Sequence, residues 1–433
     1  MLETMKERAK KAVAVLQAQG ADKAQAGVSY TVTQEFNVDG GEFSLFRTLL
    51  DKQLVMTALK DGRRGTVAQN GYEDEVLEAS AKSCLLAAAS ASPDENWDFA
   101  PLSENRDFTQ GEPEPDLDAL FDRCRELMAD IRRRFPKILM EQMIVSHKQT
   151  FSAQANSYGV LYGIHEGSYA VELMFSAHEG DKASSFFGSG VVTDSLKSPF
   201  IRLGSIEKDL SAVEQQIETQ PLVGKFTGTM VLTPGCLGSL LYSLVDSFAG
   251  EDGLLGGTSP WKDKLGEQVA DERITLSLRP RDKTVVCPEP VTREGFLAED
   301  FDLITNGRLS AFALGLYGAN KLRLPRGKND GRNLVMAPGT KSIEDIIASI
   351  DRGILVGRFS GGRPASNGDF SGVAKNSFLI ENGRLGPALS ETMISGNMAQ
   401  MLHHLHAIST ERVADGATLL PYAAFDGITV SGK

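Results

Sequence analysis

The sequence predicts an α+β protein, with N-terminal helix and antiparallel-sheet domains followed by a strand-rich, glycine-rich C-terminal domain. Two observations support this fold class. Helices with one apolar stripe and strands of alternating apolar residues follow one another in the first half of the chain. Glycine then clusters at 250–257, 361–372 and 383–386, where tight turns are expected. A chain of 433 residues is long enough for two or three domains with buried cores.

The first predicted domain covers 1–91. A helix over 2–19 carries apolar residues on one face and ends at Gly20. Glycine pairs and Asp-Gly then separate alternating stretches, as in antiparallel hairpins. A second amphipathic helix covers 73–91. The predicted strands are 26–36, 42–49 and 53–60.

Residues 92–116 are acidic, contain proline and show no periodicity, which is typical of a linker. A middle α+β domain is expected over 117–221, and a C-terminal strand-rich domain over 222–433. The middle domain is predicted to contain helices at 117–135 and 205–218, with strands at 138–146, 150–156, 160–165, 169–176 and 184–190.

The charge balance bears on partners and location. With 45 basic and 57 acidic residues the chain has a net charge of −12, which disfavours general nucleic-acid binding. The cysteines at 84, 124, 236 and 287 are widely spaced, as in buried free thiols of a reducing compartment. The uncharged run 226–245 contains Pro234-Gly235, so it is read as strand, turn and helix rather than as a membrane span. With no apolar segment at the N-terminus, we expect a cytoplasmic protein without nucleic-acid or membrane partners.

The segment after Pro234 predicts a packed helix. Tyr242, Ser243, Asp246 and Ser247 fall off its apolar face. Apolar residues follow helical spacing at Leu237, Leu240, Leu241, Leu244, Val245 and Phe248.

The histidines give a weak metal signal. His165-Glu166-Gly167 and His178-Glu179-Gly180 are interpreted as turn residues at strand ends. On a helix, His403 and His406 would share one face, but no acidic residue or cysteine within a turn completes a ligand set. Histidines at the C-terminal end of a helix are the favoured interpretation, because they interact well with its dipole.

Motifs of the last third of the chain resemble those of the TldD/PmbA family, known as modulators of DNA gyrase, and specifically its PmbA (TldE) branch. The resemblance extends over nearly the whole chain. The motifs are Gly353–Gly362 (GILVGRFSGG), Asn367–Lys375 (NGDFSGVAK), Phe378–Gly383, Ser395-Gly396-Asn397 and Val430-Ser431-Gly432.

This resemblance implies a role in proteolysis. TldD-branch members are metallopeptidases with a His-Glu-x-x-x-His zinc motif, whose positions fall here on Tyr242, Ser243 and Ser247. Serine is a poor zinc ligand, and Ser243 cannot act as a base. TldD also has a cysteine near its end, where this chain has Ala414-Asp415-Gly416.

The resemblance therefore implies no catalytic residue, no metal ligand and no cofactor in this chain. Zinc is expected in a TldD-type catalytic partner, with which the chain would degrade or mature unfolded peptides. A homodimer in isolation stays open. Two alternatives also remain: a stand-alone peptide-binding or scaffold protein, and an autonomous hydrolase, for which no nucleophile–base pair is visible.

Glycine-rich strands are the candidates for peptide binding, because a missing side chain allows a peptide backbone to approach. Tight hairpin turns, with Asp369 as a turn-capping carboxylate, explain the same pattern equally well. The candidate residues are Ser360, Gly361, Gly362, Asp369, Phe370, Ser371 and Gly372.

Overall fold

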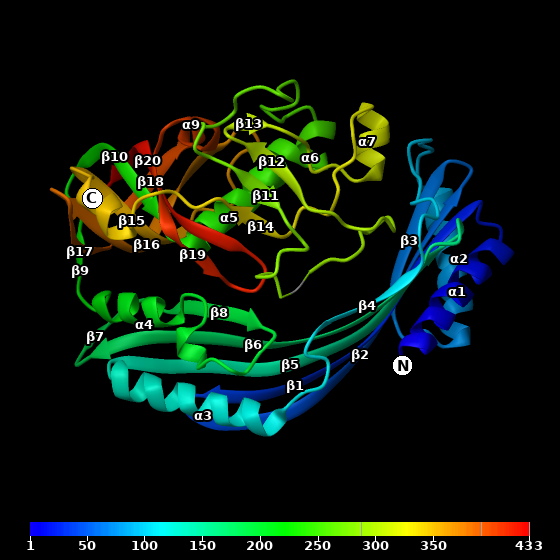
Figure 1. Ribbon diagram of the computed structural model, residues 1–433, viewed down its shortest axis with the longest axis horizontal. Coiled ribbons are helices and arrows are strands. Elements are labelled where there is room, and N and C mark those ends of the chain that lie inside the picture. Colours follow the sequence, from blue (N-terminus) through cyan, green and yellow to red (C-terminus); the bar gives the residue numbers. More distant parts are fainter. Residues whose placement is uncertain (287, 391, 433) are drawn as a thin grey trace.

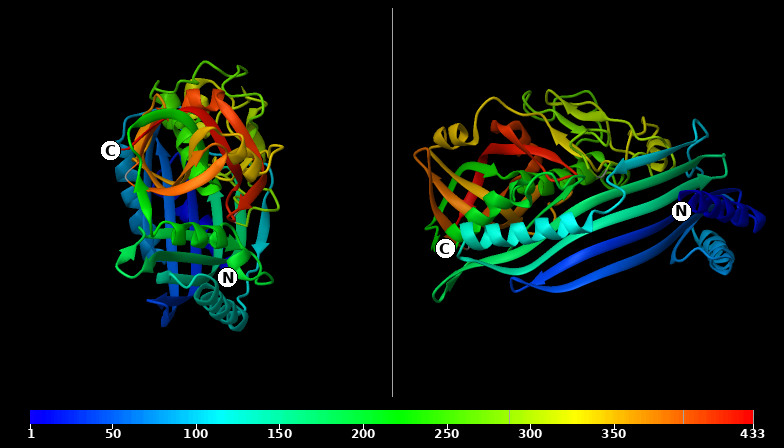
Figure 2. Two further views of the ribbon diagram at one scale, coloured as in Figure 1. Left: turned by 90° about the vertical axis from the view of Figure 1, so that its left-hand side faces the viewer. Right: turned by 60° about the horizontal axis from the view of Figure 1, so that its bottom comes forward.

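A long twisted sheet lies beneath a strand-rich C-terminal body in the computed structural model, which describes residues 1–286, 288–390 and 392–432 (Figure 1). The two layers are also visible from the end of the molecule and from below (Figure 2). The predicted α+β class is confirmed.

The first sheet has the strand order β3-β2-β1-β5-β6-β4, and β8 also pairs with β6. Its central strands are longer than the sequence predicts. Residues 138–146 and 150–156 form one strand, because β5 pairs with β6 on one side and β1 on the other over most of its length. The strands are β1 (Lys23–Asp39), β2 (Glu42–Lys60), β3 (Arg63–Asn70), β4 (Arg106–Gly111), β5 (Ile138–Asn156), β6 (Leu161–Glu179), β7 (Lys182–Ala183) and β8 (Phe187–Thr193).

This sheet contains residues from three of the predicted segments. β1 lies within 1–91 and pairs antiparallel with β5, which lies within 117–221. β4 lies within the predicted linker 92–116 and pairs parallel with β6. One sheet therefore runs through both predicted N-terminal domains and the linker between them.

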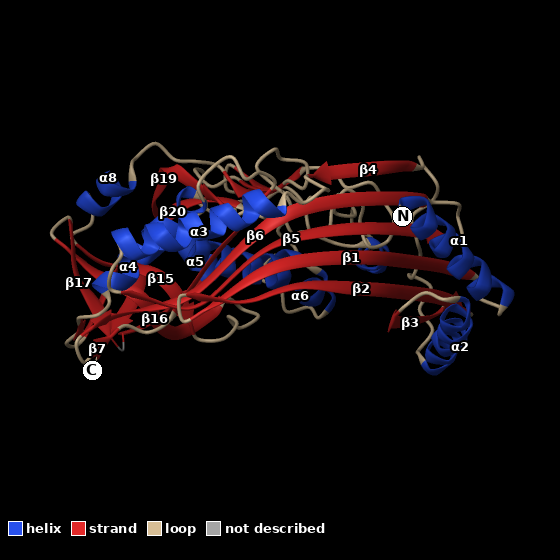
Figure 3. Ribbon diagram, turned by 90° about the horizontal axis from the view of Figure 1, so that it is seen from below, coloured by secondary structure: helices blue, strands red, loops and turns tan. Residues whose placement is uncertain are grey.

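Helices cover this sheet at its two ends (Figure 3). α1 (Leu2–Ala18) and α2 (Asp74–Ser90) share one apolar core with the sheet, and α3 (Leu117–Arg134) and α4 (Ile206–Gln215) share another. Asp116 caps α3 by accepting from the backbone N–H of Ala119 at 3.0 Å. These four helices lie within two residues of the predicted bounds, apart from the C-terminal end of α4.

The C-terminal body is built around a closed ring in which β10, β15, β16, β18 and β20 pair in that order and β20 returns to β10. The largest apolar core fills it. Its strands are β9 (Thr219–Pro221), β10 (Lys225–Leu232), β11 (Leu276–Leu278), β12 (Phe301–Thr305), β13 (Arg308–Leu309), β14 (Leu334–Met336), β15 (Arg352–Ser360), β16 (Asp369–Glu381), β17 (Arg384–Ser390), β18 (Thr392–Asn397), β19 (Leu405–Ala414) and β20 (Leu419–Ser431). Its helices are α5 (Pro234–Leu244), α6 (Glu251–Leu255), α7 (Leu316–Leu322), α8 (Ile343–Ala348) and α9 (Met398–His403).

The segment after α2 ties the two layers together. Trp97 stacks on Tyr317 of α7 with ring centroids 3.6 Å apart. Asp94 accepts a hydrogen bond from the Tyr317 hydroxyl at 2.9 Å and forms an ion pair with Lys321. The Lys321 ammonium holds the pKa of the Asp94 carboxyl well below its usual range.

In the described residues, no helix is long and apolar enough to span a membrane. The run 226–245 forms most of β10, a turn and α5, as predicted. Cys84, Cys124 and Cys236 are buried free thiols, while Cys287 lies outside the described residues.

Candidate functional site

Helix α5 starts and packs as its sequence dictates. Thr233 is its N-cap, and its hydroxyl accepts from the Cys236 backbone N–H at 3.5 Å. Pro234 follows at the first helical position, where its missing N–H costs nothing. The predicted apolar stripe is confirmed, with Leu237, Leu240, Leu241, Leu244, Val245 and Phe248 all at most 3% exposed.

Tyr242, Ser243 and Ser247 do not provide a zinc donor set. The Tyr242 hydroxyl donates to the carbonyl oxygen of Arg332, and burial raises the pKa of this phenol to about 12. The Ser243 hydroxyl donates to the carbonyl oxygen of Ser239 at 3.1 Å, one turn back in the helix. Ser247 lies in the single π-turn (Val245–Ala249) that follows α5. The residues at these positions therefore do not fit zinc.

Tyr242 lines a cavity of about 650 Å³ between α5 and the long sheet, whereas Ser243 and Ser247 do not. The sheet side is formed by even-numbered residues of β5 and β6, including Thr150, Gln154 and Glu166. Odd-numbered residues of β5 point to the other face of the sheet, where Met143 and Val145 pack in a helix-covered core. Strand alternation thus supplies a polar wall to the cavity and an apolar face to the helices.

The opposite wall carries two carboxyl groups. Burial raises the pKa of both Glu289 and Asp330. The Arg332 guanidinium lies 2.9 Å from a Glu289 oxygen, and Arg293 donates its backbone N–H to Asp330 at 2.9 Å. Across the cavity, burial also raises the pKa of Glu166 on β6. Lys148, Arg293 and Arg332 line the same cavity, so a bound substrate would meet both acidic and basic groups.

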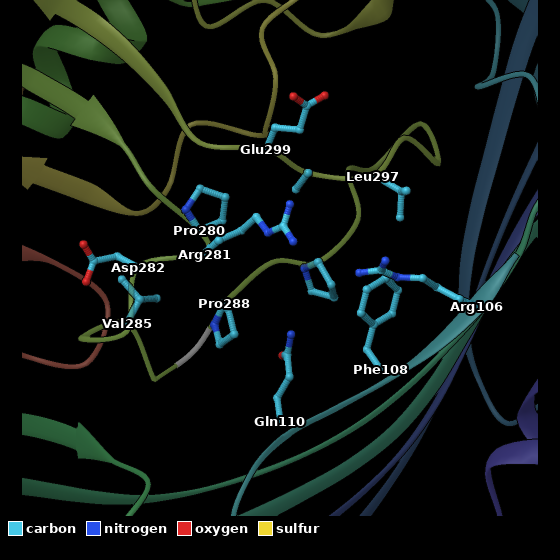
Figure 4. A pocket seen from close by; sticks show the side chains of 12 residues that line it. Arg106, Phe108, Gln110, Pro280, Arg281, Asp282, Val285, Pro288, Leu297 and Glu299 are labelled. Atoms are coloured by element: carbon cyan, nitrogen blue, oxygen red, sulfur yellow. The ribbon is translucent and has the colours of Figure 1, made fainter. Parts of the chain in front are cut away.

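A second cavity of about 540 Å³ continues the first along the sheet and shares Pro288 and Pro290 with it. Arg106, Phe108 and Gln110 of β4 line one side of it (Figure 4). Across from them lies the 280–299 segment of the C-terminal body, with Pro280, Arg281, Leu297 and Glu299 (Figure 4). We call the two cavities together the sheet cleft.

The sheet cleft runs beside an unpaired strand edge. β4 pairs with β6 on one side, and no strand in the described part of the chain pairs with its other side. The side-chain oxygen of Gln110 is buried and has no hydrogen-bond partner among the described residues. Free backbone groups and apolar prolines together suit an extended chain that pairs with β4. This cleft was missed from the sequence, because β4 lies in the segment interpreted as a linker.

The predicted peptide-binding residues lie elsewhere, at the end of the β15–β16 hairpin where the loop after Ser360 connects the two strands. Gly361 and Gly372 face each other, and a Cβ added to Gly361 would lie 2.6 Å from the Gly372 Cα. Phe370 is buried, with its ring 5.8 Å from that of Phe359. The structure brings the residues of 360–372 together in one hairpin and keeps them out of the sheet cleft.

Asp369 closes this hairpin onto α9. Its Oδ1 accepts from Asn397 at 2.8 Å, and its Oδ2 accepts from Asn367 at 2.8 Å. These amides hold the pKa of the Asp369 carboxyl below its usual range. Asn397 also caps α9 by accepting from Ala399 and Gln400. Peptide contact at the hairpin stays a prediction.

Two interpretations of the histidines need correction. His165 and Glu166 lie in the middle of β6 rather than at a strand end, so they point to opposite faces of the sheet. His403 ends α9, while His406 lies in β19, so the two share no helical face. Among the described residues, no group of three His, Cys, Asp or Glu side chains could hold a metal ion.

Comparisons with known proteins identify the class to which this fold and cleft belong. Residues 225–432 match the family model of the PmbA/TldA metallopeptidase C-terminal domain. The complete fold is similar to that of TldE from Thermococcus kodakarensis, with a TM-score of 0.81 at 21% identity, covering 98% of this chain and 100% of that one.

Curated relatives of similar sequence are also PmbA proteins. The metalloprotease PmbA of Escherichia coli O157:H7 is 23% identical over 430 residues, which cover 93% of this chain and 91% of the relative. A PmbA homologue of Buchnera aphidicola subsp. Acyrthosiphon pisum is 31% identical over 150 residues, about a third of each chain. Residues 225–432 therefore carry the C-terminal domain of this metallopeptidase family, and the predicted resemblance to the TldD/PmbA family is confirmed.

Proposed function

We propose that this chain is a PmbA/TldE-like subunit of a cytoplasmic peptidase assembly and holds unfolded peptides for a TldD-type partner. The partner contributes zinc and cuts the peptide, and this chain has no metal or cofactor of its own. The observation that carries the proposal is the residue set at the motif positions of α5. Tyr242 and Ser243 lie on α5 and Ser247 lies in the π-turn that follows it, so hydroxyl groups occupy the positions where imidazole and carboxylate groups would be needed for zinc chemistry.

The sheet cleft supports a peptide substrate. An extended segment can pair with the free edge of β4 through its backbone, which makes binding insensitive to sequence. Folded proteins would not offer an unpaired backbone to this edge, so the cleft favours unfolded peptides.

An apolar strand edge supports a protein partner. β3 pairs only with Gln53–Lys60 of β2, so residues 42–52 have no neighbouring strand on that side in the described residues. Large apolar side chains are exposed there, with Leu50 65%, Phe46 50% and Leu45 47% exposed. Such a patch on a free edge marks an interaction surface, and we assign it to the TldD-type subunit.

Zinc analysis and partner capture test the proposal together. The chain purified alone and dialysed should contain well under one zinc per molecule, measured by elemental analysis. Mixing with a TldD-type subunit should give a complex that contains zinc and elutes ahead of either subunit. Stoichiometric zinc in the isolated chain would contradict the interpretation that Tyr242, Ser243 and Ser247 do not bind zinc. A chain that binds peptides but no TldD-type subunit would favour the stand-alone scaffold instead.

A further inference from the structure

A further cavity of about 1160 Å³ lies at the other end of α5 and shares no lining residue with the sheet cleft. Residues of β8 and α4 form one wall. The first turn of α5 and the strands β15, β16 and β20 form the other. We call it the α5 N-terminal cavity. The function proposed above does not involve this cavity.

Three basic side chains at this cavity, Arg202, Lys208 and Arg358, have no carboxylate partner among the described residues. The Lys208 ammonium lies 3.4 Å from the Tyr422 hydroxyl and 5.0 Å from the centre of its ring. The Arg358 guanidinium lies 5.5 Å from the Phe186 ring. These cations therefore remain available to an anion that enters the cavity.

Most acidic groups of the same walls are already bound. Glu207 pairs with Arg134. Asp209 accepts hydrogen bonds from the hydroxyls of Ser189 and Ser205 at 2.6 and 2.5 Å. Asp415 accepts from the backbone N–H groups of Ala417 and Thr418. Of the four acidic residues that line the cavity, only Glu344 forms no hydrogen bond or ion pair among the described residues, so the groups left free are predominantly basic.

One further feature points into the same space. The first turn of α5, the positive end of an 11-residue helix, lines the cavity, and a Cβ added to Gly235 there would meet nothing within 4 Å. The cavity thus offers positive groups to a ligand.

The remaining surface is apolar. Phe187, Ile201, Phe359 and Phe378 come from four different elements and line the cavity together. A ligand that satisfies these groups has a carboxylate and an apolar side chain. The C-terminal residue of a peptide has this combination.

We infer that the α5 N-terminal cavity binds the C-terminal residue of an apolar peptide. Its carboxylate lies among Arg358, Lys208 and the first turn of α5, and its side chain lies against the aromatic wall. This site is independent of the proposed function, because it requires neither a partner nor cleavage.

The test uses the isolated full-length chain and the probe fluorescein-Ala-Ala-Leu-Phe with a free C-terminal carboxylate. Fluorescence anisotropy should show saturable binding, and the same peptide with a C-terminal amide should bind at least tenfold more weakly. Arg358→Gln and Lys208→Gln should each weaken binding of the acid about tenfold. Lys262→Gln, on an exposed loop away from the cavity, is the matched control and should leave binding unchanged.

Gly235→Phe fills the cavity from a position with open space, so it should abolish binding while thermal melting stays unchanged. Equal binding of acid and amide, or full binding by Gly235→Phe, would overturn the inference. Displacement of the probe by millimolar inorganic phosphate as effectively as by unlabelled peptide would show a plain anion site, which also overturns it. Arg358→Gln gives an independent answer if Gly235→Phe does not fold.

Discussion

Tyr242 is the first of the three residues that we propose to occupy the positions of the zinc motif. Burial raises the pKa of its phenol to about 12, so the hydroxyl keeps its proton at neutral pH and donates it to the Arg332 carbonyl oxygen. A protonated phenol held in this way is neither a metal ligand nor a base. Its contribution is to close one end of the sheet cleft.

Neighbouring residues of α5 should differ sharply in their effect on stability. Leu241 is 3% exposed in the largest core, so Leu241→Asp should lower the free energy of unfolding by about 3–5 kcal/mol. Ser243→Ala removes only a hydroxyl bonded within the helix and should change it by less than about 0.5 kcal/mol. Urea denaturation measures both. Similar losses in the free energy of unfolding for the two variants would contradict the assignment of Leu241 to the buried face of α5 and of Ser243 to another face.

Asp209 should make stability depend on pH. Burial raises its pKa to about 6, against the opposing hydrogen bonds from Ser189 and Ser205. The folded state therefore holds the proton more tightly than the unfolded state, so stability should fall as pH rises from about 4 to about 6 and level off above, by up to about 3 kcal/mol. Asp209→Asn should flatten this part of the profile in urea midpoints measured from pH 4 to 7. An unchanged slope in the variant would show that another group is responsible.

At the scale of elements, the close approach of two backbone segments in the β15–β16 hairpin explains why Gly361 and Gly372 face each other. A Cβ at Gly361 would lie 2.5 Å from the Ser371 carbonyl oxygen, so the glycines let two strands of the same chain approach closely.

Gly361→Val should therefore destabilise the protein, by about 1–3 kcal/mol in the free energy of unfolding. Ser360→Val is the matched control, because Ser360 is exposed in the same hairpin and should change the value by less than about 0.5 kcal/mol. Chemical denaturation compares the two. If Gly361→Val melts like the parent chain yet loses peptide binding, the hairpin contacts substrate after all.

Elements with local signals could be predicted, and those defined by distant pairing could not. The stripe from Leu237 to Phe248 predicted α5, since helix packing follows 3.6-residue spacing. Helical spacing would put His403 and His406 on one face, but α9 ends at His403 and β19, which pairs with β20, begins at Leu405. The free edge of β4 depends on its pairing with β6, some 55 residues later, which no local pattern reveals.

At the scale of the whole molecule, the two layers form the sheet cleft and leave one apolar edge uncovered. The long sheet could not be inferred from the sequence, because β1 pairs with β5 across more than a hundred residues. The family motifs, by contrast, could be recognised in the sequence, because each is a short continuous segment in or next to a strand of the C-terminal ring.

The uncovered edge of β2 should be the site where the partner binds. Leu50→Lys places a charge on this edge and should reduce complex formation with a TldD-type subunit at least tenfold, measured by light scattering. Leu86→Lys is the matched control, since Leu86 is 62% exposed on α2 and lies outside the free edge at residues 42–52. If both variants form the complex equally well, the edge of β2 is not part of the interface.

The central claim is that this chain holds the peptide while a TldD-type subunit supplies zinc and cuts it. Peptide cleavage with each subunit alone and with both together tests this claim most directly. An unfolded, quenched-fluorescence peptide should stay intact with this chain alone and be cut rapidly when a TldD-type subunit is added. The combined activity should be lost with a zinc chelator and recovered with added zinc. Chelator-insensitive cleavage by the isolated chain, or full activity of the partner without it, would contradict the account.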